Sequence, residues 1–383
     1  MSRRILIITE LIAPYRIPVF NALAQRNGID LHVIFLSETD YSQRQWRVYK
    51  DEIRFPYQVL SSWRRRLGRR NFLLNWGLET ALLQARPDFI ICGGYNYVAS
   101  WQSKSWARRN GVAFSLWCES TSRDFRKGYR FTEFCKKRFF RHCDAFVVPG
   151  RSSYEYLKDF GVPEKLIFTA PNAVDTELFA DRATVIRQGA ATHREALRLP
   201  QRFFLYAGRL VREKGIFDLL RAYGALPPEL RKEVGLVFVG DGPERSALRQ
   251  QAAAIRSASI HLVGFAHRED LAAYYALADA FVFPTHTDRW GLVVNEAMAC
   301  GLPIIASDAA GCVADLVEDG ENGRIVPVGN VSKLACAMED IALNAGLRAL
   351  MSRRSRERIQ QYSPEAWAAG MANAVMPQRG EAA

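Results

Sequence analysis

The sequence has 383 residues, enough for two or three domains with buried cores, which excludes a short module stapled by disulfides. Hydrophobic residues make up 49% of the chain and charged residues 24%, which excludes a disordered chain, a collagen-like repeat and a coiled coil. The formal net charge of +12 indicates an anionic partner such as nucleic acid, a membrane surface or a phosphorylated substrate. Residues 1–180 hold 28 lysines and arginines against 17 acidic residues, so nearly all of the excess lies in the first half.

Cysteine usage and the N-terminus bear on the compartment. Seven cysteines without a Cys-x-x-Cys spacing predict neither a disulfide framework nor a zinc site, and favour a reducing, cytoplasmic environment. The opening MSRRILIITE leads directly into a strand-like run and lacks the pattern of a secretory signal. No apolar run approaches the roughly 18 residues that span a bilayer. We therefore expect a cytoplasmic protein whose membrane contact is peripheral.

The first half of the chain alternates short apolar runs with helical segments. The runs are nearly continuous in Ile, Val, Leu and Phe, as in strands buried on both faces of a parallel sheet. These strands are expected at residues 5–9, 31–36, 89–92, 113–118, 145–148 and 166–169. With helices over 71–85 and 131–142, the repeated βαβ pattern predicts a doubly wound α/β sheet.

A second series of the same kind follows a less regular stretch at residues 173–202. Its strands are expected at 203–207, 236–239, 261–263, 280–283, 304–306 and 324–326. Its helices are expected at 216–223, 268–278, 292–299 and 331–360, before a last one at 363–376. Two Rossmann-like domains, 1–172 and 173–361, are more economical than one sheet. The terminal segment 362–383 can pack on either, including back onto the first.

The loop after the first strand of the second series carries two cations between two glycines. Gly208 ends the strand, Arg209 and Lys214 follow, and Gly215 opens the next helix. Cations and free backbone N–H groups at a helix N-terminus suit a diphosphate. Taken alone, the loop can equally be an ordinary charged surface turn. The Gly-Asp-Gly-Pro-Glu turn that begins at Gly240 is a weaker signal of the same kind.

The most specific pattern lies at residues 283–303. Asp288 precedes Gly291 in the loop after a strand, and Glu296 lies about a turn and a half into the following helix. The two carboxylates can therefore reach opposite ends of one ligand, with the amides of residues 291–293 between them at the positive end of the helix. A carboxylate that holds a ribose diol, as at the acidic position of the Rossmann fold, is a natural role for Glu296.

The motifs GRLVREKG, GDGPE, HLVGF and PTHTDRWGLVVNEAMACGLP follow one another between residues 208 and 303. Together with APNAVDTELF at 170–179, they resemble the nucleotide-sugar-binding half of the retaining glycosyltransferases of family 4, also called glycosyl transferases group 1. The resemblance covers residues 165–330, and the N-terminal half resembles the family mainly in its βα pattern. It implies an α/β protein of the GT-B fold, with two Rossmann-like domains facing an interdomain cleft, that moves a sugar from a nucleoside diphosphate sugar to a hydroxyl acceptor.

The resemblance also implies roles for matching residues. Arg209 and Lys214, beside Gly208, would neutralise the donor diphosphate as it leaves. Glu296 would bind the ribose, and Asp288 would bind a hydroxyl of the donor sugar where the family usually has the longer Glu, which leaves the donor preference open. The remaining donor contacts would come from backbone groups at Gly264, Phe265, Gly291, Leu292 and Val293. No Asp-x-Asp element is evident, so we expect neither a metal nor another cofactor.

The N-terminal half departs from the family after its strands. The loop after the first strand, Gly-rich in many members, here holds Pro14, Tyr15 and Arg16. These residues would grip an anionic acceptor or the donor phosphate, or else merely shape a helix entrance. Glu119, at a strand end where several members carry a functional His, is either catalytic or a structural carboxylate that caps the next turn. Weaker candidates for the acceptor site are Tyr95 and Asn96.

Two basic stretches in the first half suit an anionic surface. Trp63 lies beside five arginines, which are Arg64, Arg65, Arg66, Arg69 and Arg70. The expected helix 129–143 has two faces. The face expected in the core has Phe131, Phe134, Cys135, Phe139 and His142. The face expected at a membrane interface has Lys136, Lys137, Phe140 and Arg141. A solvated surface is the alternative for each stretch.

These observations favour a glycosyltransferase that works at the inner face of a membrane. Its acceptor would be a glycan or a lipid-linked molecule, as in polysaccharide, O-antigen or exopolysaccharide assembly, and the basic half would contact the anionic lipids. The runner-up is another GT-B enzyme of sugar nucleotides, such as an epimerase. Nucleic acid is the least favoured partner, because the basic residues lack an RRM, KH or zinc-finger framework.

Overall fold

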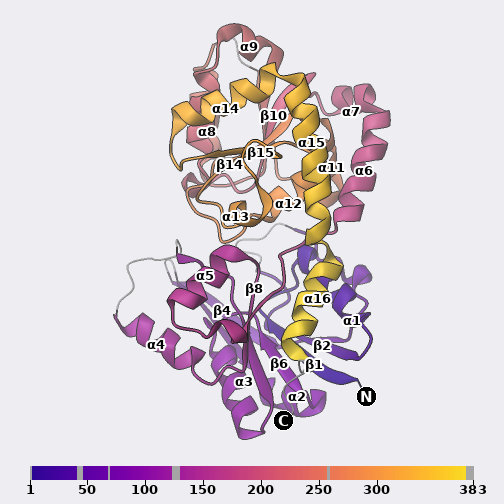
Figure 1. Ribbon diagram of the computed structural model, residues 1–383, viewed down its shortest axis with the longest axis vertical. Coiled ribbons are helices and arrows are strands. Elements are labelled where there is room, and N and C mark those ends of the chain that lie inside the picture. Colours follow the sequence, from indigo (N-terminus) through magenta and orange to yellow (C-terminus); the bar gives the residue numbers. More distant parts are fainter. Residues whose placement is uncertain (1, 41–45, 68–69, 123–129, 257–258, 377–383) are drawn as a thin grey trace. The chain divides into compact units, whose positions relative to one another are not determined.

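Two parallel sheets, each covered by helices, divide the chain into two units (Figure 1). The computed structural model describes residues 2–40, 46–67, 70–122, 130–256 and 259–376. The first unit comprises Met1–Val174 and Pro364–Ala383, and the second comprises Asp175–Ser363. The chain thus passes between the units two residues later than the predicted division, and its last helix belongs to the first unit.

The sheet of the first unit has seven parallel strands in the order β3-β2-β1-β6-β7-β8-β9. They are β1 (Arg3–Thr9), β2 (Ile29–Phe35), β3 (Tyr57–Val59), β6 (Phe89–Cys92), β7 (Ala113–Trp117), β8 (Ala145–Val148) and β9 (Ile167–Thr169). The order reverses between β1 and β6, so the loops after these two strands flank a crevice at the carboxyl edge of the sheet. The short edge strand β3 is not predicted, because its three residues form no continuous apolar run.

Helices cover this sheet and close its core. They are η1 (Pro14–Arg16), α1 (Ile17–Ala24), η2 (Lys50–Glu52), α2 (Leu78–Ala85), α3 (Val98–Arg109), α4 (Arg130–Phe140), α5 (Arg151–Asp159), η4 (Glu164–Leu166) and α16 (Pro364–Val375). The last of these, α16, packs beside α1 (Figure 1). Its fully buried Trp367 lies 5.6 Å from the Phe20 ring and 5.4 Å from the Trp117 ring, between ring centroids. The C-terminal helix therefore completes the core of the first unit.

A β-hairpin stands where the sequence predicted the start of a helix. The strands β4 (Ser61–Leu67) and β5 (Arg70–Trp76) pair antiparallel, and helix begins only at Leu78. The prediction of a helix over 71–85 is therefore wrong in its first half, because cross-strand pairing outweighs the helical spacing of the leucines. One of the five arginines expected at a membrane, Arg64, instead bonds Glu10 (Nη1 to Oε1, 2.8 Å) and Asp40 (Nη1 to Oδ2, 3.1 Å).

The faces of α4 also differ from the prediction. Phe140, expected on the interfacial face, is buried together with Phe139, whereas Phe134, expected in the core, is 60% exposed. Phe139 and Phe140 are buried at the end of α4, and His142, also expected in the core, is exposed beyond the end of the helix. The side chain of Phe131 and the start of the expected helix at residue 129 lie outside the described residues.

The second unit repeats the strand order of the first. Its six parallel strands follow the order β12-β11-β10-β13-β14-β15, which again reverses between the first and fourth strands in the chain. They are β10 (Arg202–Ala207), β11 (Val234–Val239), β12 (Ile260–Gly264), β13 (Ala280–Phe283), β14 (Ile304–Ser307) and β15 (Gly323–Val326).

The helices of the second unit correct two predictions. They are α6 (Thr176–Gln188), α7 (Ala190–Ala196), η5 (Arg212–Lys214), α8 (Ile216–Gly224), α9 (Pro228–Glu233), α10 (Arg245–Ala253), α11 (Arg268–Leu277), α12 (Leu292–Ala299), α13 (Val313–Leu316), α14 (Val331–Leu343), α15 (Ala345–Ile359) and η6 (Gln360–Tyr362). Helices α6 and α7 occupy the stretch expected to be irregular. The expected helix 331–360 is two helices, because Asn344 adopts an extended conformation and its Oδ1 accepts a bond from the Leu347 N–H at 2.8 Å.

None of the helices that the structure describes is both long enough and apolar enough to cross a membrane.

Candidate functional site

In the second unit, the loops after β10 and β13 meet at the carboxyl edge of the sheet. The switch in strand order places them side by side, where this class of sheet binds its ligands. Gly215, at the end of the first loop, has φ +66°, and a Cβ atom there would lie 1.9 Å from the carbonyl oxygen of Pro284 in the second loop. The two loops therefore touch through their backbones, and both the conformation and the close approach require glycine.

The turn after β11 packs on the same loop. Gly240 has φ +136°, and a Cβ atom there would lie 1.9 Å from the Gly208 carbonyl oxygen. The Leu210 N–H donates to the Asp241 carbonyl at 2.9 Å, and a Cβ atom at Gly242 would lie 2.4 Å from the Leu210 carbonyl oxygen. The loops after β10, β11 and β13 thus touch through Gly208, Gly215, Gly240 and Gly242. They form one surface of backbone, the glycine floor, whose main-chain amides a ligand can approach closely.

Two charged residues predicted separately form an ion pair on this floor. The Lys214 Nζ donates to Asp288 Oδ2 at 2.5 Å and to the Thr287 carbonyl at 3.2 Å. Arg209 is exposed and has no ion pair with any residue that the structure describes. Arg212, in the same loop, donates from Nε to Glu244 Oε1 at 2.9 Å. An anionic ligand that reaches Lys214 would therefore compete with the Asp288 carboxylate.

The N-terminus of α12 lies at the end of the same loop. Asp288 Oδ1 accepts a bond from the Trp290 N–H at 3.1 Å, and Gly291 caps the helix with φ +101°. A Cβ atom at Gly291 would lie 2.7 Å from the Phe283 ring. The first turn of an α-helix leaves its amides without intrahelical partners, so Leu292 and Val293 present N–H groups and a positive dipole end to a ligand.

Glu296 lies on the first turns of α12 in a poorly solvated position. Burial raises the pKa of its carboxyl to about 7, although the Tyr275 hydrogen bond and the charge of Arg268 act in the opposite direction. The Tyr275 hydroxyl donates to Glu296 Oε2 at 2.8 Å. Sequence reasoning missed Tyr275, because it comes from α11, 21 residues earlier, and no motif joins the two. The carboxyl is placed to accept hydrogen bonds from a ligand's hydroxyls.

The loop after β12 supplies an aromatic ring at the same edge. The Gly264 carbonyl accepts a bond from the Gly240 N–H at 2.7 Å, so this loop is tied to the glycine floor. Phe265 is 42% exposed, and its ring meets the edge of His267 with 5.0 Å between centroids. An exposed aromatic ring beside backbone N–H groups offers a surface on which a planar base can stack.

In the first unit, the candidates gather around Arg16. Its Nη2 donates to Glu119, and its Nη1 donates to Asn172 Oδ1 at 3.0 Å. The guanidinium also lies 4.1 Å from the Trp117 ring centroid, a cation–π contact. Glu119 therefore holds Arg16, which neither of its two predicted roles included. Asn172 and Trp117 were missed as site residues, since they join Arg16 only through the folding of β7 and the segment after β9.

Pro14 and Tyr15, next to Arg16 in the same loop, have different surroundings. Pro14 is buried at the first position of η1, and Pro18 occupies the first turn of α1, so both shape the entrance to that helix. The Tyr15 ring packs edge-on against Trp46, with 5.9 Å between centroids. The Arg16 guanidinium lies 5.3 Å from the Tyr15 ring centroid, so Tyr15 adjoins the cluster around Glu119, whereas Pro14 shapes the backbone of the loop.

The two weaker candidates after β6 have different environments. The Tyr95 ring packs against Phe139 and Phe140, at 5.9 and 5.8 Å between centroids, and burial raises the pKa of its hydroxyl to about 12. Tyr95 is thus mainly a packing residue, and its hydroxyl stays protonated at neutral pH. Asn96 is exposed at the carboxyl edge of the sheet.

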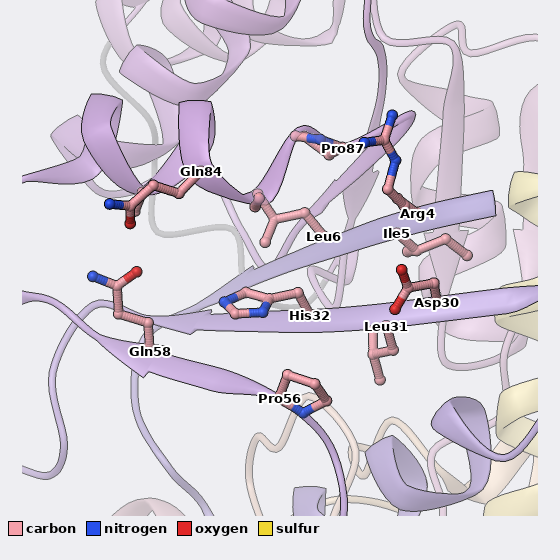
Figure 2. A pocket seen from close by; sticks show the side chains of 12 residues that line it. Arg4, Ile5, Leu6, Asp30, Leu31, His32, Pro56, Gln58, Gln84 and Pro87 are labelled. Atoms are coloured by element: carbon pink, nitrogen blue, oxygen red, sulfur yellow. The ribbon is translucent and has the colours of Figure 1, made fainter. Parts of the chain in front are cut away.

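A cavity of about 260 Å³ opens at the opposite edge of the first sheet (Figure 2). Residues from the beginnings of β1 and β2 line it, with residues from β3 and the end of α2. Arg4 in its wall pairs with Asp88, Nη2 to Oδ1 at 2.9 Å, and burial lowers the pKa of His32. The cavity is therefore separate from the candidate residues, which follow the carboxyl ends of the strands.

Metal ligands do not cluster at either site. Within the part of the chain that the structure describes, no group of three His, Cys, Asp or Glu side chains is placed to hold an ion. The expected metal independence stays a prediction.

Two family models match the chain, one in each half. Residues 190–358 match the model described as Glycosyl transferases group 1, and residues 20–178 match the one described as Glycosyltransferase Family 4. The first match contains the glycine floor, the Lys214–Asp288 pair and Glu296. The second contains Glu119 and Asn172 of the cluster around Arg16.

Curated relatives share these matches over part of their length. The D-inositol 3-phosphate glycosyltransferase of Saccharomonospora viridis is 33% identical over 212 residues, which are 52% of this chain and 49% of that protein. The capsular polysaccharide biosynthesis glycosyltransferase CapM of Staphylococcus aureus is 28% identical over 155 residues, 40% of each chain. The chain thus spans about half the length of such relatives, or less.

Solved structures resemble the chain over nearly all of its length. Anabaena HepE in complex with UDP has a TM-score of 0.75 at 18% identity, and the match covers 98% of this chain and 99% of that one. Sucrose-phosphate synthase from Thermosynechococcus elongatus has a TM-score of 0.73 at 21% identity, covering 97% and 98%. At such identities the likeness shows the fold, and the predicted GT-B fold is confirmed.

Proposed function

The chain belongs to the glycosyl transferases of group 1, in glycosyltransferase family 4, and from that premise we propose that it transfers a sugar from a nucleoside diphosphate sugar to a hydroxyl acceptor, with retention at the anomeric carbon. The observation that carries the proposal is the glycine floor with Lys214 on it, beside the N-terminus of α12. Backbone amides, a lysine and a helix dipole at one place form a site for a diphosphate.

The chemistry assigned to this site is stabilisation of the leaving group. The bond between the anomeric carbon and the phosphate oxygen breaks, and Arg209, Lys214 and the first amides of α12 take up the negative charge that develops on the phosphate. The acceptor oxygen forms the new bond on the same face of the sugar. Its proton passes to the departing phosphate oxygen, so no side-chain nucleophile is required.

Other residues of the second unit would orient the donor. Glu296 would hold the ribose hydroxyls, and the Phe265 ring would lie against the base. Asp288 would contact the donor sugar once the diphosphate has taken its place on Lys214. A uridine or guanosine diphosphate sugar is the proposed donor, and the UDP bound by the structurally similar HepE supports the first of these. The reaction is proposed to need no metal.

The proposed acceptor is a glycan or a lipid-linked molecule that the first unit binds near Arg16. The names of curated relatives support this class, since they include enzymes of capsular polysaccharide and of lipopolysaccharide core biosynthesis. The excess of positive charge in the first half suits peripheral contact with the anionic inner face of a membrane.

A panel of nucleotide sugars tests the proposed function. A ligand at a hundred times its Kd adds about 2.7 kcal/mol to the free energy of unfolding, which a thermal shift detects. We expect one UDP- or GDP-sugar to protect the chain in the presence of EDTA, and to lose its sugar to an acceptor in a membrane extract. Protection by none of them would contradict the proposal. An isomerised nucleotide sugar formed without acceptor would identify an epimerase instead.

A further inference from the structure

We propose that the outer face of the β4–β5 hairpin docks on an anionic lipid bilayer. This surface, the aromatic face, consists of Trp63, Arg65, Phe72, Leu74 and Trp76. It names the membrane contact that the proposed function leaves unspecified, and it rests on that function for its use, which is to bring the enzyme to a lipid-borne acceptor.

The register of the hairpin puts these side chains on one side. Trp63 pairs with Leu74, and Arg65 pairs with Phe72. Trp76 lies opposite Ser61 on the same side, since alternate residues of a strand point to the same face. Directly opposed side chains are about 5 Å apart, so the apolar groups form one continuous patch.

The opposite face of the hairpin is fixed to the first unit. Leu73 is buried, and Asn75 Nδ2 donates to the Leu36 carbonyl at 2.5 Å. Arg64 bonds the carboxylates of Glu10 and Asp40, as described above. A one-residue change of register would withdraw Leu73 and Arg64 from these partners, so the aromatic face is held outward.

The aromatic face is unusually apolar for an exposed strand pair. Trp63 is 47% exposed, Phe72 44%, Leu74 42% and Trp76 58%. Exposed hairpins of soluble proteins carry charged residues instead, because an exposed apolar face or strand edge promotes aggregation. Tryptophan concentrates at the headgroup level of membranes, where its ring meets apolar chains and its N–H meets water.

Charge indicates that the lipid is anionic. Arg65 is exposed within the aromatic face. The first unit holds 29 lysines and arginines against 17 acidic residues, whereas the second unit holds 23 of each. The entire net charge of +12 therefore belongs to the unit that carries the aromatic face, as an anionic surface would require.

The anchors of the hairpin connect the aromatic face to the acceptor side of the first unit. Glu10 directly follows β1, and Leu36 directly follows β2, at the carboxyl edge of the sheet. Arg16 lies on the loop that begins at Glu10. A bilayer against the aromatic face would thus place a lipid-borne hydroxyl close to the edge where the proposed acceptor residues gather.

Vesicle binding by the full chain tests the inference. We expect the chain to sediment with vesicles of phosphatidylcholine containing phosphatidylglycerol, and brominated acyl chains to quench its tryptophan fluorescence. Trp63→Ser combined with Trp76→Ser should weaken binding by about tenfold or more, since two rings that the bilayer would partly bury are lost. Arg65→Gln should weaken it by about fivefold, and only on anionic vesicles.

A matched control removes exposed apolar residues from the second unit. Val185 on α6 and Leu343 on α14 are 64% and 68% exposed, and serine at both positions should leave vesicle binding unchanged. UDP and GDP thermal shifts of each variant report the donor site, so a failure of the proposed function is seen independently of vesicle binding.

Three results would overturn the inference. One is wild-type protein that stays in the supernatant with anionic vesicles. Another is a Trp63→Ser, Trp76→Ser variant that folds, as judged by circular dichroism, and still binds them as wild type does. The third is a wild-type dimer in light scattering that this variant abolishes, which would assign the aromatic face to a second copy of the chain. Quenching of the wild-type chain needs no variant, so the test survives a folding defect.

Discussion

The two units have the same strand order but build their candidate sites from different materials. In the second unit the site combines charged side chains with a floor of backbone, where Gly215 and Gly240 let loops touch at distances that a Cβ atom would forbid. In the first unit it is made of side chains, where Arg16 is held by Glu119, Asn172 and the Trp117 ring. The second unit is electrically neutral, and the first carries the entire net charge. A backbone site leaves glycine motifs in the sequence, whereas a side-chain site does not.

The backbone character of the second site is tested by Gly215→Ala. The new Cβ atom would strain a residue with φ +66° and overlap the Pro284 carbonyl, so we expect a loss of roughly 3 to 5 kcal/mol in the free energy of unfolding. Gly161→Ala in the first unit is the control, since Gly161 has φ +86° with open space around it and should lose about 1 to 2 kcal/mol. Equal losses in urea unfolding would refute the close approach.

The charge on the glycine floor is tested by Lys214→Ala. If the ammonium stabilises the departing diphosphate, kcat/KM should fall by an amount equivalent to about 2 to 4 kcal/mol, by analogy with the loss of one oxyanion donor. Arg212→Ala removes a neighbouring cation that instead pairs with Glu244, and should leave turnover near wild type. The same loss in both variants would mean that general positive charge, and not Lys214 itself, serves the reaction.

The buried carboxyl is tested by the pH dependence of Glu296→Gln. The folded pKa of about 7 lies above the ordinary value of 4.5, so the folded state holds a proton that the unfolded chain has released. Wild type should therefore lose stability relative to the variant as the pH rises from 5 to 8, by at most about 3 kcal/mol. Denaturant unfolding at each pH measures this difference, and a difference independent of pH would place Glu296 in water.

The side-chain site of the first unit is tested by Glu119→Gln. Weakening the partly buried bond to Arg16 should cost about 1 kcal/mol of stability and raise the KM for the acceptor, with nucleotide affinity unchanged. Asp88→Asn disrupts an exposed ion pair with Arg4 and should leave the stability and the KM for the acceptor near wild type. A change in nucleotide affinity with Glu119→Gln would move this residue to the donor site.

Much of the fold could be predicted because its central strands are buried on both faces. Strands such as β1 and β10 have continuous apolar runs, which are visible in the local sequence. The hairpin β4–β5 was missed because one of its faces is apolar and exposed, which reverses the usual relation between hydrophobicity and burial. The break at Asn344 was missed because helical periodicity on both sides of it outweighed a single capping residue.

The candidate site could be predicted where a short segment determines its geometry. Gly208, Lys214 and Asp288 were found from glycine spacing and from the family resemblance. The ion pair between Lys214 and Asp288 joins residues 74 positions apart, so no local pattern could show that the two side chains pair with each other. The partners of Arg16 lie up to 156 positions away, and only the assembled sheet brings them together.

Hydrogen exchange of the full chain with and without UDP or GDP tests most directly where the donor binds. If the nucleoside diphosphate binds the second unit, exchange should slow at residues 208–215 and 284–296, with residues 10–16 and 93–96 unchanged. Protection confined to the two loops of the first unit, or found in neither unit, would contradict the assignment of the donor to the glycine floor.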